Sequence, residues 1–120
     1  RFIPIEQRGG PVAASLLLPI LLVTLGGNLY EEVLFRGYFQ GFLERSGTMS
    51  PFKAALASGV AFAFGHTFLA ITVTDTGTSL LVFALYEGVI ASLIRMKFGV
   101  FSATLTHGLA IFLLSSGLLQ

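Results

Sequence analysis

The sequence contains no cysteine, and only 11% of its 120 residues are charged. The absence of cysteine excludes disulfide bonds, thiol nucleophiles and cysteine-based metal sites. Soluble proteins usually carry about 25% charged residues, so the low charge indicates that the solvent of this chain is lipid. The net charge of +1 is too small to indicate a nucleic-acid partner.

Apolar residues take the place of the missing charge. Hydrophobic residues make up 54% of the sequence, and the mean hydropathy is +0.86. A membrane-spanning helix needs about 20 apolar residues, and four segments come close to or exceed that length, at about 11–42, 50–70, 80–98 and 100–119. We therefore expect an all-α, polytopic transmembrane helix bundle of about four spans, in contact with membrane lipid.

Local signals mark the ends of these segments. The first segment is too long for one upright span, and we expect a kink or break at the glycine pair 26–27, because such pairs are a usual cause of kinks. Ser50 and Pro51 are typical of a helix cap and a first helical residue. The polar run at 72–79 predicts a loop, and Gly99 predicts the end of the third segment.

The length of the chain favours one domain, and we expect a single intramembrane domain over 1–120 with its motif-bearing core at 31–111. The chain begins at Arg1 and shows no signal peptide, so we expect an excerpt from a longer membrane protein. Basic residues cluster at the connections on one side of the bundle, and the positive-inside rule makes that side cytoplasmic. These residues are Arg45, Lys53, Arg95 and Lys97.

Two adjacent carboxylates, Glu31 and Glu32, interrupt the first apolar segment. A charge at the centre of a membrane helix costs about 2.5–3.5 kcal/mol on insertion scales, so such residues indicate a functional site. Glu32 and Arg36 are four residues apart, which predicts an ion pair on one helix face. Glu31 points about 100° away and has no such partner in the sequence, which favours it as a general base.

The two histidines also lie within apolar segments. Counted inward from the basic ends of the helices, Glu32 and His66 lie at similar depth, about 20 Å along the helix axis, and His107 lies somewhat shallower. Polar groups within a membrane bundle face one another rather than lipid, so we expect one site that contains Glu31 and Glu32 with both histidines. His66 could share the proton of Glu31, and His107 could donate to an oxyanion; the alternative is that each histidine is a structural hydrogen-bonding residue.

Glu87, in the third apolar segment, is ambiguous from the sequence alone. It could neutralise Arg95 two turns later or face Arg36 across the bundle, and a catalytic role is the less favoured alternative. Glycines such as Gly59 and Gly108 most simply permit close helix packing.

Three stretches of the sequence resemble the motifs of one enzyme family. The run EEVLFR at 31–36 resembles an EExxxR motif, FAFGH at 62–66 resembles FxxxH, and HGLAI at 107–111 stands where HxxxN is expected. In this order within apolar helices, they are similar to the CAAX-protease and bacteriocin-processing family of intramembrane endopeptidases, which includes CAAX prenyl protease 2 and lysostaphin-resistance-like proteins.

The resemblance implies a helical membrane bundle with its site open toward the cytoplasmic leaflet, in a bacterial cell membrane. It implies that Glu31 and His66 activate a water, that His107 helps to stabilise the tetrahedral oxyanion, and that Glu32 and Arg36 support the site. The implied reaction is hydrolysis of a peptide bond near the C-terminus of a membrane-associated protein or peptide, with or without a prenyl group. The partner is then a substrate with a membrane-anchored tail.

The chain departs from the family pattern at Ile111, where the family usually has asparagine. Isoleucine has no donor, and the loss of one oxyanion donor can cost about 10²–10³ in rate. The alternative function is therefore a catalytically weak or inactive binding or immunity protein of the same fold, and proton or ion transport is a third hypothesis. Asn28, one turn before Glu31, is an available amide.

A metal site is the remaining alternative. His66, His107 and Glu31 would make the His₂Glu ligand set of a catalytic zinc. These residues lie on separate segments rather than in an HExxH spacing, and the resemblance implies direct activation of water. We therefore expect no metal and no other cofactor.

Overall fold

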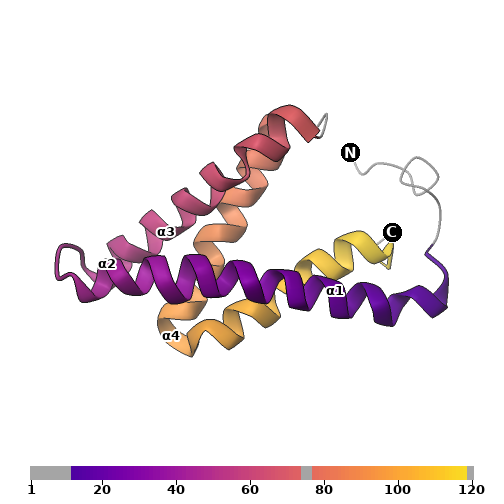
Figure 1. Ribbon diagram of the computed structural model, residues 1–120, viewed down its shortest axis with the longest axis horizontal. Coiled ribbons are helices and arrows are strands. Elements are labelled where there is room, and N and C mark those ends of the chain that lie inside the picture. The colour runs from indigo at the N-terminus through magenta and orange to yellow at the C-terminus, as the bar shows by residue number, and fades with distance from the viewer. Residues whose placement is uncertain (1–11, 74–76, 119–120) are drawn as a thin grey trace.

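The computed structural model of the chain describes residues 12–73 and 77–118, and it is shown in Figure 1. All regular elements within these two ranges are helical, which confirms the predicted all-α class. In chain order they are α1 (Ala14–Glu32), η2 (Val33–Gln40), α2 (Gly41–Arg45), α3 (Pro51–Gly65), η3 (Leu69–Val73) and α4 (Thr78–Ser116), where η marks a π-helix.

Three helical stretches of the described residues are long and apolar enough to cross a membrane: Ala14–Arg45, Pro51–Thr72 and Thr78–Ser116. The third stretch is bent at Gly99, whose φ of 85° and ψ of 174° are not helical. The positive φ is readily adopted only by glycine. The two predicted segments on either side of Gly99 are therefore the two arms of α4, 78–98 and 100–116.

The two arms of α4 pack against different partners. Figure 1 shows the first arm, in orange, beside α3, and the second arm, in yellow, running along α1, in agreement with the contacts between these helices. This arrangement brings the end of α1, the π-helix η2, the C-terminal cap of α3 and both arms of α4 into one region. All residues proposed for the site come from these segments.

The predicted break at the glycine pair 26–27 is wrong, because α1 continues through both residues to Glu32. A Cβ at either glycine would have no heavy atom of the described residues within 4 Å, so no packing contact there forces a bend. The irregularity lies further along, in the π-helix Val33–Gln40 that directly follows the glutamate pair. Single π-helical turns are frequent at functional sites.

The predicted start of the second segment is confirmed. Pro51 is the first residue of α3, and the hydroxyl of Ser50 accepts a hydrogen bond from the backbone N–H of Lys53. The loop predicted at 72–79 is shorter than expected, since Val73 still belongs to η3 and α4 already begins at Thr78. Residues 74–76 of that loop lie outside the described residues.

Glycines allow the helix backbones to approach closely, as predicted. A Cβ on Gly88 would lie 2.9 Å from the carbonyl oxygen of Gly59, where α3 meets the first arm of α4. A Cβ on Gly108 would lie 2.7 Å from the side chain of Leu25, where the second arm meets α1. Gly88 directly follows Glu87, and Gly108 directly follows His107. The two close approaches therefore carry the side chains of Glu87 and His107 into the bundle.

The distribution of side chains is the reverse of that in a soluble protein. Large apolar side chains such as Val23, Phe64 and Phe101 are more than 70% exposed, whereas the side chains of Glu32 and Arg36 are fully buried. Polar groups in a membrane bundle face its interior and apolar groups face lipid. The exposed apolar surface is therefore the surface that meets the hydrocarbon.

Candidate active site

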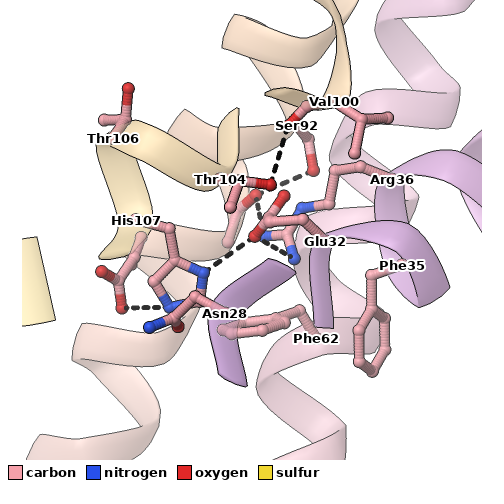
Figure 2. Close-up of polar contacts among 12 residues, drawn as sticks. Asn28, Glu32, Phe35, Arg36, Phe62, Ser92, Val100, Thr104, Thr106 and His107 are labelled. Carbon is pink, nitrogen blue, oxygen red and sulfur yellow. Dashed lines mark hydrogen bonds and ion pairs between the residues drawn. The ribbon is translucent and has the colours of Figure 1, made fainter. Parts of the chain in front are cut away.

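Glu32 lies at the centre of a buried polar cluster, shown in Figure 2 between Arg36 and His107. Its Oε1 atom is 3.1 Å from Nη1 of Arg36 and 2.8 Å from Nδ1 of His107. The ion pair predicted between Glu32 and Arg36 is present. The contact with His107 adds a second partner from α4, which the sequence did not reveal.

Arg36 is held by three kinds of contact. Beside its ion pair with Glu32, its Nη2 donates a hydrogen bond of 2.9 Å to the carbonyl oxygen of Gly88. Its guanidinium carbon lies 4.4 Å from the ring centroid of Phe62, close enough for a cation–π interaction. A buried charge is tolerated when it is paired and hydrogen-bonded. These contacts meet that condition in part, since Nε and Nη1 of Arg36 are buried and have no hydrogen-bond partner among the described residues.

Phe62, the first residue of the FAFGH run, packs against both histidines. Its ring centroid is 4.4 Å from that of His66 and 5.4 Å from that of His107, and it meets the ring of Phe35 edge-on at 5.3 Å. The ring is almost fully buried. Phe62 therefore fixes the positions of both imidazoles as well as the guanidinium of Arg36.

A cavity of about 270 Å³ lies beside this cluster. Glu31, His66 and His107 all line it, so the structure brings together the three residues that the sequence singled out for catalysis. The supporting residues Glu32 and Arg36 are not among its lining residues. The remaining lining residues include Asn28, Glu87 and Ile111.

Glu31 and His66 present complementary groups to the cavity. The carboxylate of Glu31 has no hydrogen-bond or ion-pair partner among residues 12–73 and 77–118 and is free to bind a water. Nδ1 of His66 lies 2.9 Å from the carbonyl oxygen of Phe62. A carbonyl only accepts, so this contact assigns the proton to Nδ1 and leaves Nε2 of His66 as an acceptor.

Glu87 is the site residue that sequence reasoning missed. Its Oε2 lies 3.4 Å from Nε2 of His107, whereas Arg95 pairs with Glu44 at 2.5 Å. Of the two partners considered for Glu87, Arg95 is therefore ruled out. Glu87 does face across the bundle, where it contacts His107 and lies close enough to Arg36 to interact with its charge. The available signal was a carboxylate inside an apolar segment, which by itself indicates a functional position.

The geometry does not fit the zinc alternative. No group of three or more His, Asp or Glu side chains is arranged to hold a metal ion in the part of the chain that the structure describes. Both ring nitrogens of His107 face carboxylates, and Nδ1 of His66 faces the carbonyl of Phe62. Neither ring nitrogen of His107 is therefore free for a metal ion that Glu31 and His66 would share.

Ile111 and Asn28 both line the cavity. The side chain of Ile111 offers no hydrogen-bond donor to the cavity. Asn28 is 8% exposed, and its Nδ2 donates to the carbonyl oxygen of Thr24 at 2.5 Å. The side-chain amide nearest to the cavity therefore comes from α1 rather than from α4.

A lipid-facing helical exterior around buried carboxylates and histidines defines a polytopic membrane protein with an intramembrane polar site. Residues 13–113 match the family described as type II CAAX prenyl endopeptidase Rce1-like. This match covers most of the chain, so the chain belongs to that family of membrane proteases and hydrolases. No curated protein and no solved structure matches the chain.

Proposed function

We propose that this protein is an intramembrane endopeptidase in which Glu31 and His66 activate the attacking water. The observation that carries the proposal is the shared cavity, which places the unpaired carboxylate of Glu31 with His66 and His107. Membership of a protease family supplies the reaction class. Of the three sequence hypotheses, peptide hydrolysis is the one that uses all of these groups.

The proposed reaction begins with a water in the cavity. Its proton passes to Glu31, assisted by Nε2 of His66, while the oxygen attacks the substrate carbonyl carbon. The resulting oxyanion accepts a hydrogen bond from His107. The C–N bond then breaks, the leaving nitrogen takes the proton that Glu31 held, and a carboxylic acid and an amine are released.

Glu32 and Arg36 act through His107 in this scheme. Glu32 accepts a hydrogen bond of 2.8 Å from Nδ1–H of His107 and so fixes the plane of the ring. Arg36 balances the charge of Glu32 within the bundle. Support of this kind behind a catalytic histidine orients the ring and sets which nitrogen faces the substrate.

The proposed substrate is a membrane-associated protein or peptide cut near its C-terminus, with or without a prenyl group. A second cavity of about 370 Å³ shares Glu87 and His107 with the site and is otherwise lined mainly by apolar side chains such as Phe83 and Leu113. Such a cavity suits an apolar anchor beside the scissile bond. We also propose that the side of the bundle with the clustered basic residues is cytoplasmic, and that the site opens toward that leaflet of a bacterial membrane, as the family resemblance implies.

The test is cleavage of a prenylated and an unprenylated tail peptide by the reconstituted full-length protein. Glu31→Gln is expected to abolish cleavage while insertion and helix content stay unchanged. Glu44→Gln serves as the matched control, because Glu44 pairs with Arg95 outside the cavity. Cleavage that survives Glu31→Gln at the wild-type rate would remove Glu31 as the base.

One observation favours a second candidate function. Ile111 lines the cavity without a hydrogen-bond donor, as expected for a binding or immunity protein that keeps the fold but has lost catalysis. In that case the wild type is silent with every peptide, and Glu31→Gln leaves partner binding or protection intact.

A further inference from the structure

Glu87 and His107 face each other from the two arms of α4. Their closest atoms, Oε2 and Nε2, are 3.4 Å apart, and both side chains are at most 10% exposed. The other carboxylate oxygen of Glu87, Oε1, is buried and has no hydrogen-bond partner among the described residues. Burying a carboxylate oxygen without a hydrogen-bond partner is costly. A residue that is kept despite this cost indicates a functional role.

The contact is favourable only with a proton on one of the two facing atoms. An ionised carboxylate only accepts hydrogen bonds, and so does an unprotonated ring nitrogen. The opposite nitrogen, Nδ1, lies 2.8 Å from Glu32 and donates there. A neutral His107 would then turn a bare Nε2 toward Glu87, and the two acceptors would repel each other. A proton on Nε2 of His107 removes this repulsion.

The charges around His107 also favour an additional proton. Glu32 lies against its Nδ1, Glu87 against its Nε2, and Glu31 and His66 share its cavity. Among residues 12–73 and 77–118, Arg36 is the one fixed positive charge that contacts this group, through its ion pair with Glu32. Three carboxylates thus surround one guanidinium, and protonation of the His107 ring offsets part of the excess negative charge.

We propose that Glu87 is a positioning residue that keeps a proton on Nε2 of His107, so that the ring presents an N–H to the cavity. The contact of 3.4 Å is longer than the ordinary range of about 2.7–3.2 Å. Glu87 therefore occupies this N–H only weakly, and the N–H stays available, without rotation of the ring, to an oxyanion that forms beside it. A hydrogen bond from a cationic donor is about twice as strong as one from a neutral donor. This added strength offsets part of the oxyanion stabilisation that Ile111, without a donor, does not supply. The proposal rests on the proposed role of His107 as oxyanion donor.

The first test observes the proton directly. ¹⁵N NMR of histidine-labelled full-length protein in lipid distinguishes protonated from bare ring nitrogens, and His66→Gln identifies the signals of His107. We expect both nitrogens of His107 to be protonated in the wild type and Nε2 to lose its proton in Glu87→Gln. A bare Nε2 in the wild type, or protonation that is unchanged in Glu87→Gln, would overturn the proposal. This readout needs no substrate, so it decides the proposal even if the protein cleaves none of the peptides tested.

The second test is kinetic. Glu87→Gln and Glu87→Leu are expected to lower kcat about tenfold to a hundredfold, up to the loss of one oxyanion donor, with KM changed less than about twofold. Glu44→Gln, which also removes a partly buried carboxylate, is expected to leave both constants unchanged. If Nε2 loses its proton in Glu87→Gln while kcat stays at the wild-type value, Glu87 has no role in the reaction. Glu87→Gln is isosteric, so it remains informative if Glu87→Leu fails to fold.

Discussion

His107 is bonded to Glu32, 75 positions earlier in the chain, through a contact of 2.8 Å between Nδ1 and Oε1. The second glutamate of the adjacent pair is thus committed to orienting a histidine and balancing Arg36, whereas the first is left free at the cavity. Two neighbouring carboxylates have different surroundings because successive positions on a helix point about 100° apart.

The buried ion pair predicts a large and non-additive effect on stability. Arg36→Met would leave Glu32 with His107 as its only partner, and breaking a buried pair typically costs about 3–5 kcal/mol. We expect the double variant Glu32→Gln/Arg36→Met to lose clearly less than the sum of the single variants. Unfolding in mixed detergent, followed for the four proteins of this cycle, measures the coupling. Strict additivity would show that the contact contributes nothing.

The ring of Phe62 predicts a combined loss of stability and activity. Phe62→Leu removes the contact with the guanidinium of Arg36 and the packing against both histidines, and we expect a loss of about 1–3 kcal/mol with a lower kcat. Phe64→Leu is the matched control, since Phe64 is 74% exposed. Equal effects of the two substitutions on unfolding and cleavage would contradict this account.

Two glycines predict opposite outcomes for the same substitution. Gly88→Ala would place a methyl group 2.9 Å from the backbone oxygen of Gly59, so we expect it to separate α3 from α4 and to abolish activity. Gly26→Ala meets no heavy atom of the described residues within 4 Å and should leave stability unchanged or raise it by up to about 1 kcal/mol. Thermal unfolding of both variants checks the pair, and a destabilised Gly26→Ala would point to a break in α1 after all.

Ile111→Asn predicts a gain of function. The substitution puts an amide on the wall of the cavity that Ile111 lines, and one oxyanion donor is worth up to about 10²–10³ in rate. We expect kcat for a tail peptide to rise, with Ile111→Leu as the control that adds no donor. A rise of similar size in both variants would assign the effect to packing rather than to hydrogen bonding.

The sequence predicted those features that depend on local chemistry. Ser50 and Pro51 marked a helix start because capping is local, and the spacing of Glu32 and Arg36 predicted their ion pair because it lies within one helix. Family motifs and similar depth drew attention to Glu31, and the structure places it at the cavity.

Features that depend on pairing between distant segments were not predictable in this way. Glu87 had two candidate partners, Arg95 on its own helix and Arg36 across the bundle. Its contact with His107 depends on the bend at Gly99, which folds the second arm of α4 back so that His107 meets it. Within the π-helix after Glu32, Arg36 and Gln40 donate hydrogen bonds to the carbonyl oxygens of Gly88 and Ser92 on α4. A single sequence does not reveal such contacts between distant segments.

The bend at Gly99 also determines when the site can exist at all. At about 1.5 Å per residue, a straight helix would hold Glu87 and His107 about 30 Å apart, whereas in the folded chain they are 3.4 Å apart. A nascent chain whose last arm has not yet entered the membrane therefore has its carboxylates but lacks the histidine that faces them. The polar cluster is therefore complete only after the second arm of α4 has folded back along α1, which makes assembly of the proposed site depend on this arm.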